Sequence, residues 1–175
     1  MENLRKNAVK FGLFLGLFLI VVTTIMYAVD LSLFTKPWIG VTNLIVITLF
    51  GAFAGITYKK QQGGFLTFKE AFTAFFITVV IGFLLSTIYT ILLFNFIDPE
   101  AKAVITENLI KYTVSMMQSF GAKAADVNKI IEDLQKTDSF GAVAQLKGFA
   151  INLVIYSIIG LVTALIIRRE RPQSL

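Results

Sequence analysis

Neither cysteine nor histidine occurs anywhere in this sequence of 175 residues. The absence of cysteine excludes disulfides, thiol nucleophiles and cysteine-based metal sites. The absence of histidine removes the commonest general base and the commonest ligand of transition metals. We therefore expect no metal and no cofactor. An enzyme is disfavoured as well, because the usual pairs of catalytic groups are missing.

Charged side chains are missing from four long stretches of the chain, and this second absence indicates the class of protein. Hydrophobic residues make up 56% of the sequence, and the mean hydropathy is +0.76. A bilayer span needs about 20 mainly apolar residues, because the backbone must satisfy its own hydrogen-bonding groups in lipid. The stretches that meet this requirement are residues 9–29, 38–58, 71–97 and 149–167.

The sequence therefore predicts an all-α, polytopic membrane protein in which residues 1–175 form a single membrane domain. Lys10, at the edge of the first stretch, can reach the interface with its ammonium group. A cleaved signal peptide is the alternative for that stretch, but its apolar run is longer than the roughly 7 to 15 residues of such a peptide. The net charge of +5 does not predict nucleic-acid binding, since the basic residues form no stripe. The expected partner is the lipid bilayer.

Lysine and arginine predict the orientation, because these residues are enriched in cytoplasmic connections. Nine of the 16 basic residues lie in three segments, the N-terminus, the second connection and the C-terminal tail. The other seven are spread over residues 30–37 and 98–148, which together are about twice as long. We expect a multi-pass protein of the bacterial inner membrane with both termini in the cytoplasm. The nine residues are Arg5, Lys6, Lys10, Lys59, Lys60, Lys69, Arg168, Arg169 and Arg171.

The second connection contains GGFLTFKEAF, residues 63–72, which is typical of a tight reversal followed by a helix start. Gly63 and Gly64 give the backbone access to positive φ. Thr67 and Glu70 have the spacing of a capping box, in which each side chain bonds the backbone N–H of the other residue. The alternative is a loop in which the two glycines approach an anionic ligand near Lys59 and Lys60. That pattern is weak, because no phosphate-loop spacing is present.

The same loop carries a resemblance to a known family. A double glycine, an apolar pair, then Thr-Phe and a short polar step into an apolar helix stand between the second and third of four spans. In this layout the chain resembles a bacterial family of four-span membrane proteins, domain of unknown function 4199. The resemblance implies an inner-membrane, four-helix architecture and adds no site residues.

Small residues on every span predict close helix packing, which drives association in lipid. Each of the first two spans contains one GxxxG pair, and small residues spaced four apart run along the third span. We expect these residues to pack the four helices into one bundle, and a homodimer or larger homo-oligomer is the alternative. The residues are Gly12, Gly16, Gly51, Gly55, Thr78, Gly82 and Ser86.

Residues 98–148 are too long for a simple connection and predict a helical insert on the extracytoplasmic side. Asp98-Pro99 is a helix start, and Gly121 is a helix stop. A second helix is predicted over residues 127–136, with Glu132 and Lys136 spaced as an ion pair. Thr137, Asp138 and Ser139 are candidate N-caps of a helix that continues into the fourth span. The apolar stripe of the first helix is Ile105, Leu109, Tyr112, Met116 and Phe120.

Two functions remain open from the sequence. The favoured hypothesis is a structural or interaction component of the bacterial envelope, in which Met116, Met117 and Phe120 dock an envelope protein. The alternative is a small channel or carrier, working as an oligomer, for an uncharged or lipidic solute. Its groove would be lined by Asn43, Asn152 and hydroxyl groups. Ion-coupled transport is disfavoured, because no ionisable residue lies inside the spans.

Overall fold

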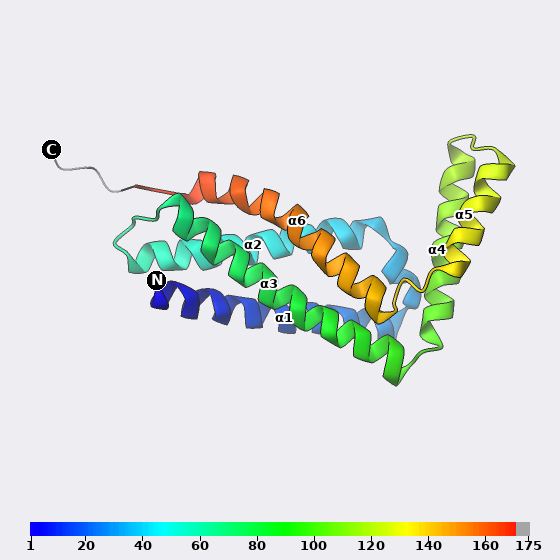
Figure 1. Ribbon diagram of the computed structural model, residues 1–175, viewed down its shortest axis with the longest axis horizontal. Helices are drawn as coiled ribbons and strands as arrows, with labels where there is room; N and C mark the ends of the chain where they lie inside the picture. Colours follow the sequence, from blue (N-terminus) through cyan, green and yellow to red (C-terminus); the bar gives the residue numbers. More distant parts are fainter. Residues whose placement is uncertain (171–175) are drawn as a thin grey trace.

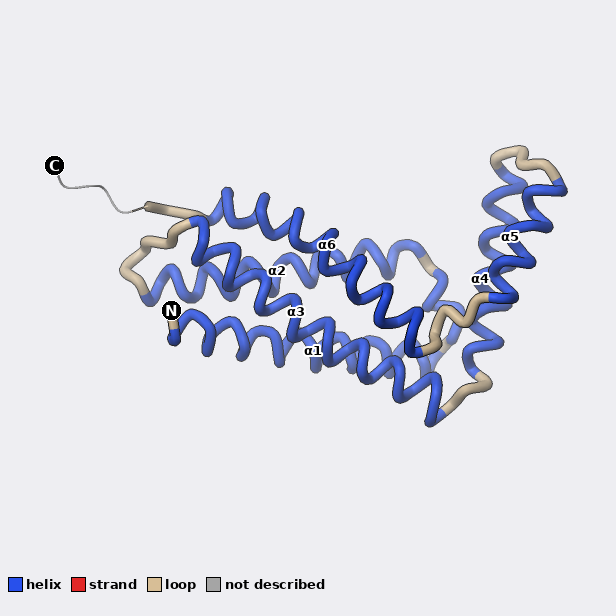
Figure 2. The backbone as a smooth tube through the Cα atoms, in the orientation of Figure 1, coloured by secondary structure: helices blue, strands red, loops and turns tan. Residues whose placement is uncertain are grey.

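A computed structural model describes residues 1–170, and Arg171 of the basic tail lies outside them. The described chain is almost entirely helical, so the all-α prediction is confirmed (Figures 1 and 2). Four helices are long and apolar enough to cross a membrane, as predicted. In chain order the elements are α1 (Glu2–Val29), the 3₁₀ helix η1 (Leu31–Thr35), α2 (Pro37–Gln61), α3 (Phe68–Leu92), the π-helical turn η2 (Leu93–Ile97), α4 (Ala101–Ser119), α5 (Ala124–Lys136) and α6 (Ala142–Ile167).

Helices α1, α2, α3 and α6 form an elongated bundle, and the α4–α5 hairpin lies across one end of it (Figure 1). We call this end the hairpin end. The opposite end, the loop end, holds the N-terminus, the connection between α2 and α3 and the end of α6. Large apolar side chains along the bundle are exposed, and only 22–28% of each candidate span is buried inside the protein. A surface of this kind is solvated by lipid rather than by water.

The helices extend beyond the predicted spans at several points. Helix α1 begins at Glu2 rather than near residue 9, because Leu4 and Ala8 on its first turns are completely buried against the bundle. Helix α6 begins at Ala142, seven residues before the predicted span. The helix runs without a break from Ala142 through Leu146 into the fourth span, as the sequence predicts.

Helix α3 is the centre of the bundle and contacts α1, α2 and α6. Phe75 on α3 is 1% exposed and lies between two glycines of different helices, Gly51 and Gly160. A Cβ atom at Gly160 would lie 2.6 Å from Phe75 Cδ1, which is closer than real contacts allow. The missing side chains therefore make the space that the phenylalanine ring fills.

The hairpin is joined to the bundle at its base. The N–H of Ala101 donates to Asp98 Oδ1 at 3.1 Å, and Gly121 ends the α4 segment with a φ of +73°. Phe94, Ala101 and Ile105 are buried together, with aromatic rings of α1, η1, α3 and the connection before α6 packed against them. This cluster connects the third span, the hairpin and the hairpin end of the bundle.

The prediction that residues 137–139 cap the last helix was wrong. The residue before α6 is Gly141, and no side chain caps the helix. Asp138 instead accepts a hydrogen bond from Lys102 Nζ on α4 at 2.9 Å. A partner more than 30 residues away in sequence thus determines the role of this carboxylate, and local spacing does not reveal such a partner.

Candidate functional site

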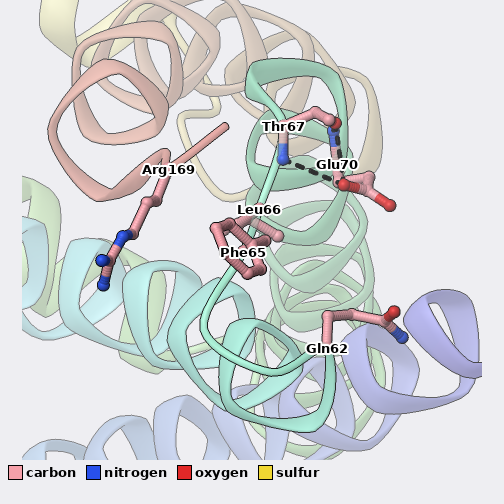
Figure 3. Close-up of a pocket in the computed structure, with 6 residues that line it drawn as sticks. All are labelled: Gln62, Phe65, Leu66, Thr67, Glu70 and Arg169. Carbon is pink, nitrogen blue, oxygen red and sulfur yellow. Dashed lines mark hydrogen bonds between the residues drawn. The ribbon is translucent and has the colours of Figure 1, made fainter. Parts of the chain in front are cut away.

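The loop end contains the turn that the glycines predict. Gly63 and Gly64 have φ angles of +70° and +89°, which residues with a side chain rarely adopt. Thr67 and Glu70 form the capping box: Glu70 N–H donates to Thr67 Oγ1 at 3.3 Å, and Thr67 N–H donates to Glu70 Oε2 at 2.9 Å. Figure 3 shows these bonds on one side of the loop and Arg169 on the other.

This loop is joined to the chain that follows α6. Leu66 and Arg169 exchange two backbone hydrogen bonds of 2.8 Å, and the Arg169 guanidinium lies 5.7 Å from the centre of the Phe65 ring. Lys59 Nζ donates to the carbonyl of Ile167 at 2.7 Å. A cavity of about 370 Å³ beside the loop includes Glu70 among its lining residues. Lys59 and the N–H groups of Gly63 and Gly64 are bonded to carbonyl groups of the protein itself, so this region has the character of a structural clasp.

The predicted packing residues lie inside the bundle, but they do not share one face. Gly12 and Gly16 on α1 face α3, and Gly82 on α3 faces Leu15 on α1. Thr78 Oγ1 donates to the carbonyls of Ala74 and Ala8, at 2.9 and 3.1 Å. The next member of the stripe, Ser86, lines a cavity next to α6 instead. Residues four apart rotate about 40° around a helix, so a stripe of this spacing turns from one neighbour to the next.

The main cavity of interest is an open one at the hairpin end, between the bundle helices and α4. It has a volume of about 470 Å³ and is lined from five helices and η1. A second cavity of about 300 Å³ lies between α3 and α6 and shares Thr90 and Gln145 with the first. Asn43 lines the first cavity and Asn152 the second, so the two asparagines that were expected in one groove lie in adjoining spaces. The polar lining of the first cavity includes Thr23, Thr35, Lys36, Asn43, Thr90, Thr113 and Gln145.

Sequence reasoning did not find Lys36, Gly40 or Gln145 as members of this site. Lys36 and Gly40 are separated by four residues and Gly40 and Asn43 by three, which is the spacing of one helix face. This spacing can be read from the sequence. Whether the three residues line a cavity depends on which helices lie opposite α2, and only the fold provides that information.

The expected partner face is at the far end of the hairpin. Along the apolar stripe of α4 the exposed fraction rises from 2% at Ile105 to 38% at Tyr112, 43% at Met116 and 85% at Phe120. Met117 is half-buried. The apolar stripe is therefore buried at its N-terminal end, at Ile105, and exposed at its C-terminal end, at Phe120.

Carboxylates at the hairpin end are held in their charged form. Bonds from the Ser32 hydroxyl and the Ser32 N–H lower the pKa of Asp30. The hydrogen bond from Lys102 lowers the pKa of Asp138, and Lys111 lowers that of Glu107. Within residues 1–170, no three acidic side chains gather as a possible metal site.

Comparison with known proteins identifies the family. Neither the curated proteins nor the solved structures contain a match to this chain. A family model described as "Protein of unknown function (DUF4199)" matches residues 10–169, which is nearly the whole chain. The resemblance that the GGFLTFKEAF loop carries is confirmed. The chain belongs to the DUF4199 family, and its four membrane-length helices make it a membrane protein.

Proposed function

We propose that the protein is a multi-pass protein of the bacterial inner membrane with the loop end in the cytoplasm and the hairpin outside. The support is the distribution of basic residues over the fold. The N-terminus, the α2–α3 loop and the segment after α6 lie at the same end of the bundle (Figure 1). These are the segments with the dense lysine and arginine residues, and such residues favour the cytoplasmic side.

Its function, in this proposal, is that of an interaction component of the envelope, and the hairpin is the part that binds. The observation that carries this proposal is the bare end of the α4 stripe, where Phe120 is 85% exposed next to Met116 at 43%. Methionine and aromatic side chains are enriched in the cores of protein interfaces. Methionine also adapts to irregular apolar surfaces.

The charge of the hairpin favours a protein over the bilayer as the occupant of this surface. Helices that adsorb on anionic lipid carry polar faces rich in lysine and arginine. On the hairpin two of the exposed lysines are paired with acids, Lys111 with Glu107 and Lys136 with Glu132. Residues 98–138 carry five lysines and seven acidic residues, so the hairpin has no excess of positive charge. A balanced surface with an apolar end is suited to an envelope protein with its own apolar patch.

Photo-crosslinking tests this proposal in living cells. A benzoyl-phenylalanine residue in place of Phe120 is expected to give a discrete protein adduct. The same residue at Lys129, on the exposed surface of α5, provides the matched control and is expected to give none. Adducts with lipid alone at position 120, or the same protein adducts at both positions, would contradict a specific protein interface.

A second candidate function is the binding or carriage of an uncharged or lipidic solute, and the cavities at the hairpin end favour it. The other half of the bundle is closed by Phe75, Val79 and Leu15, which are at most 1% exposed. A through-going channel within one protomer is thus not open. In this proposal the cavity is a binding site, and the protein has no enzymatic role.

A further inference from the structure

Asn43 differs from the other half-buried asparagines of the membrane-length helices, which are Asn7, Asn95 and Asn152. The side-chain amides of Asn7, Asn95 and Asn152 each donate to a backbone carbonyl, at 2.8 to 2.9 Å. Asn43 is half-buried at the hairpin-end cavity and makes no hydrogen bond with any residue between 1 and 170. A polar group at the depth of a membrane-length helix is costly without a partner. The amide atoms of Asn43 are not sealed off inside the protein, so a ligand that enters the cavity can reach them.

Lys36 provides a positive charge at the same cavity. It is exposed, and none of the ion pairs among the described residues includes it. Its charge adds to the lowering of the pKa of Asp30, which comes mainly from the bonds that the carboxylate accepts from Ser32 at 2.8 and 2.6 Å, but no ion pair joins Lys36 to Asp30. The ammonium group of Lys36 is accordingly available to an anion.

Space for a ligand lies between these two groups. Lys36, Gly40 and Asn43 follow one face of the start of α2, and the rise of a helix places Asn43 roughly 10 Å deeper than Lys36. A Cβ atom at Gly40 would meet nothing within 4 Å. Apolar side chains, including Met26 and Ile39, line the same cavity. The ligand is thus expected to be anionic at one end, polar in the middle and apolar beyond.

We propose that this cavity binds the glycerol phosphate headgroup of a phospholipid from the leaflet at the hairpin end. Lys36 pairs with the phosphate, and Asn43 donates to an oxygen of the glycerol region. Thr23 and Thr90 provide further hydroxyl groups at the same cavity. The inference uses the cavity of the second candidate function but requires no transport. A failure to detect solute movement leaves it intact, and so does a failure of the crosslink at Phe120.

Native mass spectrometry of the full chain, released from nanodiscs of dioleoyl-phosphatidylglycerol, tests the proposal. We expect one lipid to be retained under conditions that remove lipids bound only at the periphery. Lys36→Gln and Asn43→Leu are expected to weaken retention about tenfold each, which corresponds to the loss of one good polar contact. Gly40→Phe fills the cavity and should abolish retention. Thr48→Val is the matched control on α2, because Thr48 bonds the carbonyl of Leu44 on its own helix.

Two further measurements separate a ligand role from a structural one. If Asn43 serves a ligand, Asn43→Leu leaves the thermal stability of the lipid-free protein unchanged or higher, since no internal hydrogen bond is lost. Dioleoylglycerol, which lacks the phosphate, should be retained poorly. Equal retention in wild type and all variants would overturn the proposal, as would strong binding of dioleoylglycerol. Displacement of the lipid by an equal concentration of glycerol 3-phosphate would reassign the site to a soluble phosphate ester.

Discussion

A glycine in a membrane helix is required only where a neighbouring side chain occupies the space that a Cβ would fill. Helix α2 contains one glycine of this kind and one with open space beside it. At Gly51 an added Cβ would overlap the ring of Phe75, whereas at Gly40 it would meet nothing within 4 Å. Phe75 is buried between three helices and has no room to move aside. We expect Gly51→Ala to lower the free energy of unfolding by about 1–3 kcal/mol through overpacking.

The matched control is Gly40→Ala, which should leave stability unchanged or raise it, because alanine favours the helix by up to roughly 1 kcal/mol. Unfolding of both variants by sodium dodecyl sulfate in mixed micelles, followed by circular dichroism, provides the comparison. Equal stability of the two variants would mean that Phe75 does not fix the contact between α2 and α3.

At the scale of elements, the N-terminus of α3 is capped by two residues, Thr67 and Glu70, that can be identified from the sequence without the structure. The N–H groups of Thr67 and Glu70 are each bonded by the side chain of the other residue. Thr67→Ala removes the hydroxyl acceptor and is expected to cost about 0.5–2 kcal/mol of stability. Glu70→Gln should cost less, since glutamine is also found at this position of a capping box. Thermal unfolding in detergent that ranks Glu70→Gln as the more damaging change would contradict this account.

The base of the hairpin depends on an ion pair, and the pair predicts an acid dependence. Lys102 lowers the pKa of Asp138 in the folded protein. A carboxylate with a lowered folded pKa contributes stability above its unfolded pKa of about 3.9, and the contribution is lost as the pH falls through the folded value. Amide protection of α4, corrected for intrinsic exchange, should be constant from about pH 7 to 5 and should fall below about pH 4.

Two variants separate this effect from general acid unfolding. Asp138→Asn is expected to have lower protection of α4 at neutral pH and a flatter acid dependence, because the titrating group is gone. Glu107→Gln removes an exposed pair on the same helix and should change little, since such pairs contribute little stability. A wild-type acid profile in Asp138→Asn would exclude this carboxylate as the cause.

The sequence predicts contacts between residues that are close in the chain, but not contacts between different helices. The loop glycines, the capping box and the Glu132–Lys136 pair depend on residues within a few positions of one another, and the structure contains each of them. Asp138 and Asn43 depend on neighbours from other helices. Spacing predicts a cap at Asp138, whereas the fold gives this carboxylate a lysine partner. The sequence suggests one groove for Asn43 and Asn152, whereas the fold places them in two adjoining cavities.

At the scale of the whole molecule, the two ends of the bundle differ in construction. The loop end is clasped by bonds among the α2–α3 loop, Lys59 and the segment after α6. The hairpin end is open, with adjoining cavities and a projecting hairpin. Polar ligands and partners are therefore expected at the hairpin end, and the side of the membrane that this end faces decides which of them it can meet.

Single cysteines can determine that side directly, because the chain contains no cysteine of its own. Lys123→Cys lies at the exposed far end of the hairpin, and Lys60→Cys lies exposed at the loop end. If the basic residues hold the loop end in the cytoplasm, a charged maleimide added to intact cells should label Lys123→Cys but not Lys60→Cys. After permeabilisation both should react, and the wild-type chain should react in neither condition. The reverse pattern would place the hairpin in the cytoplasm. Labelling of both variants in intact cells would contradict the single membrane span, residues 68–97, that lies between positions 60 and 123.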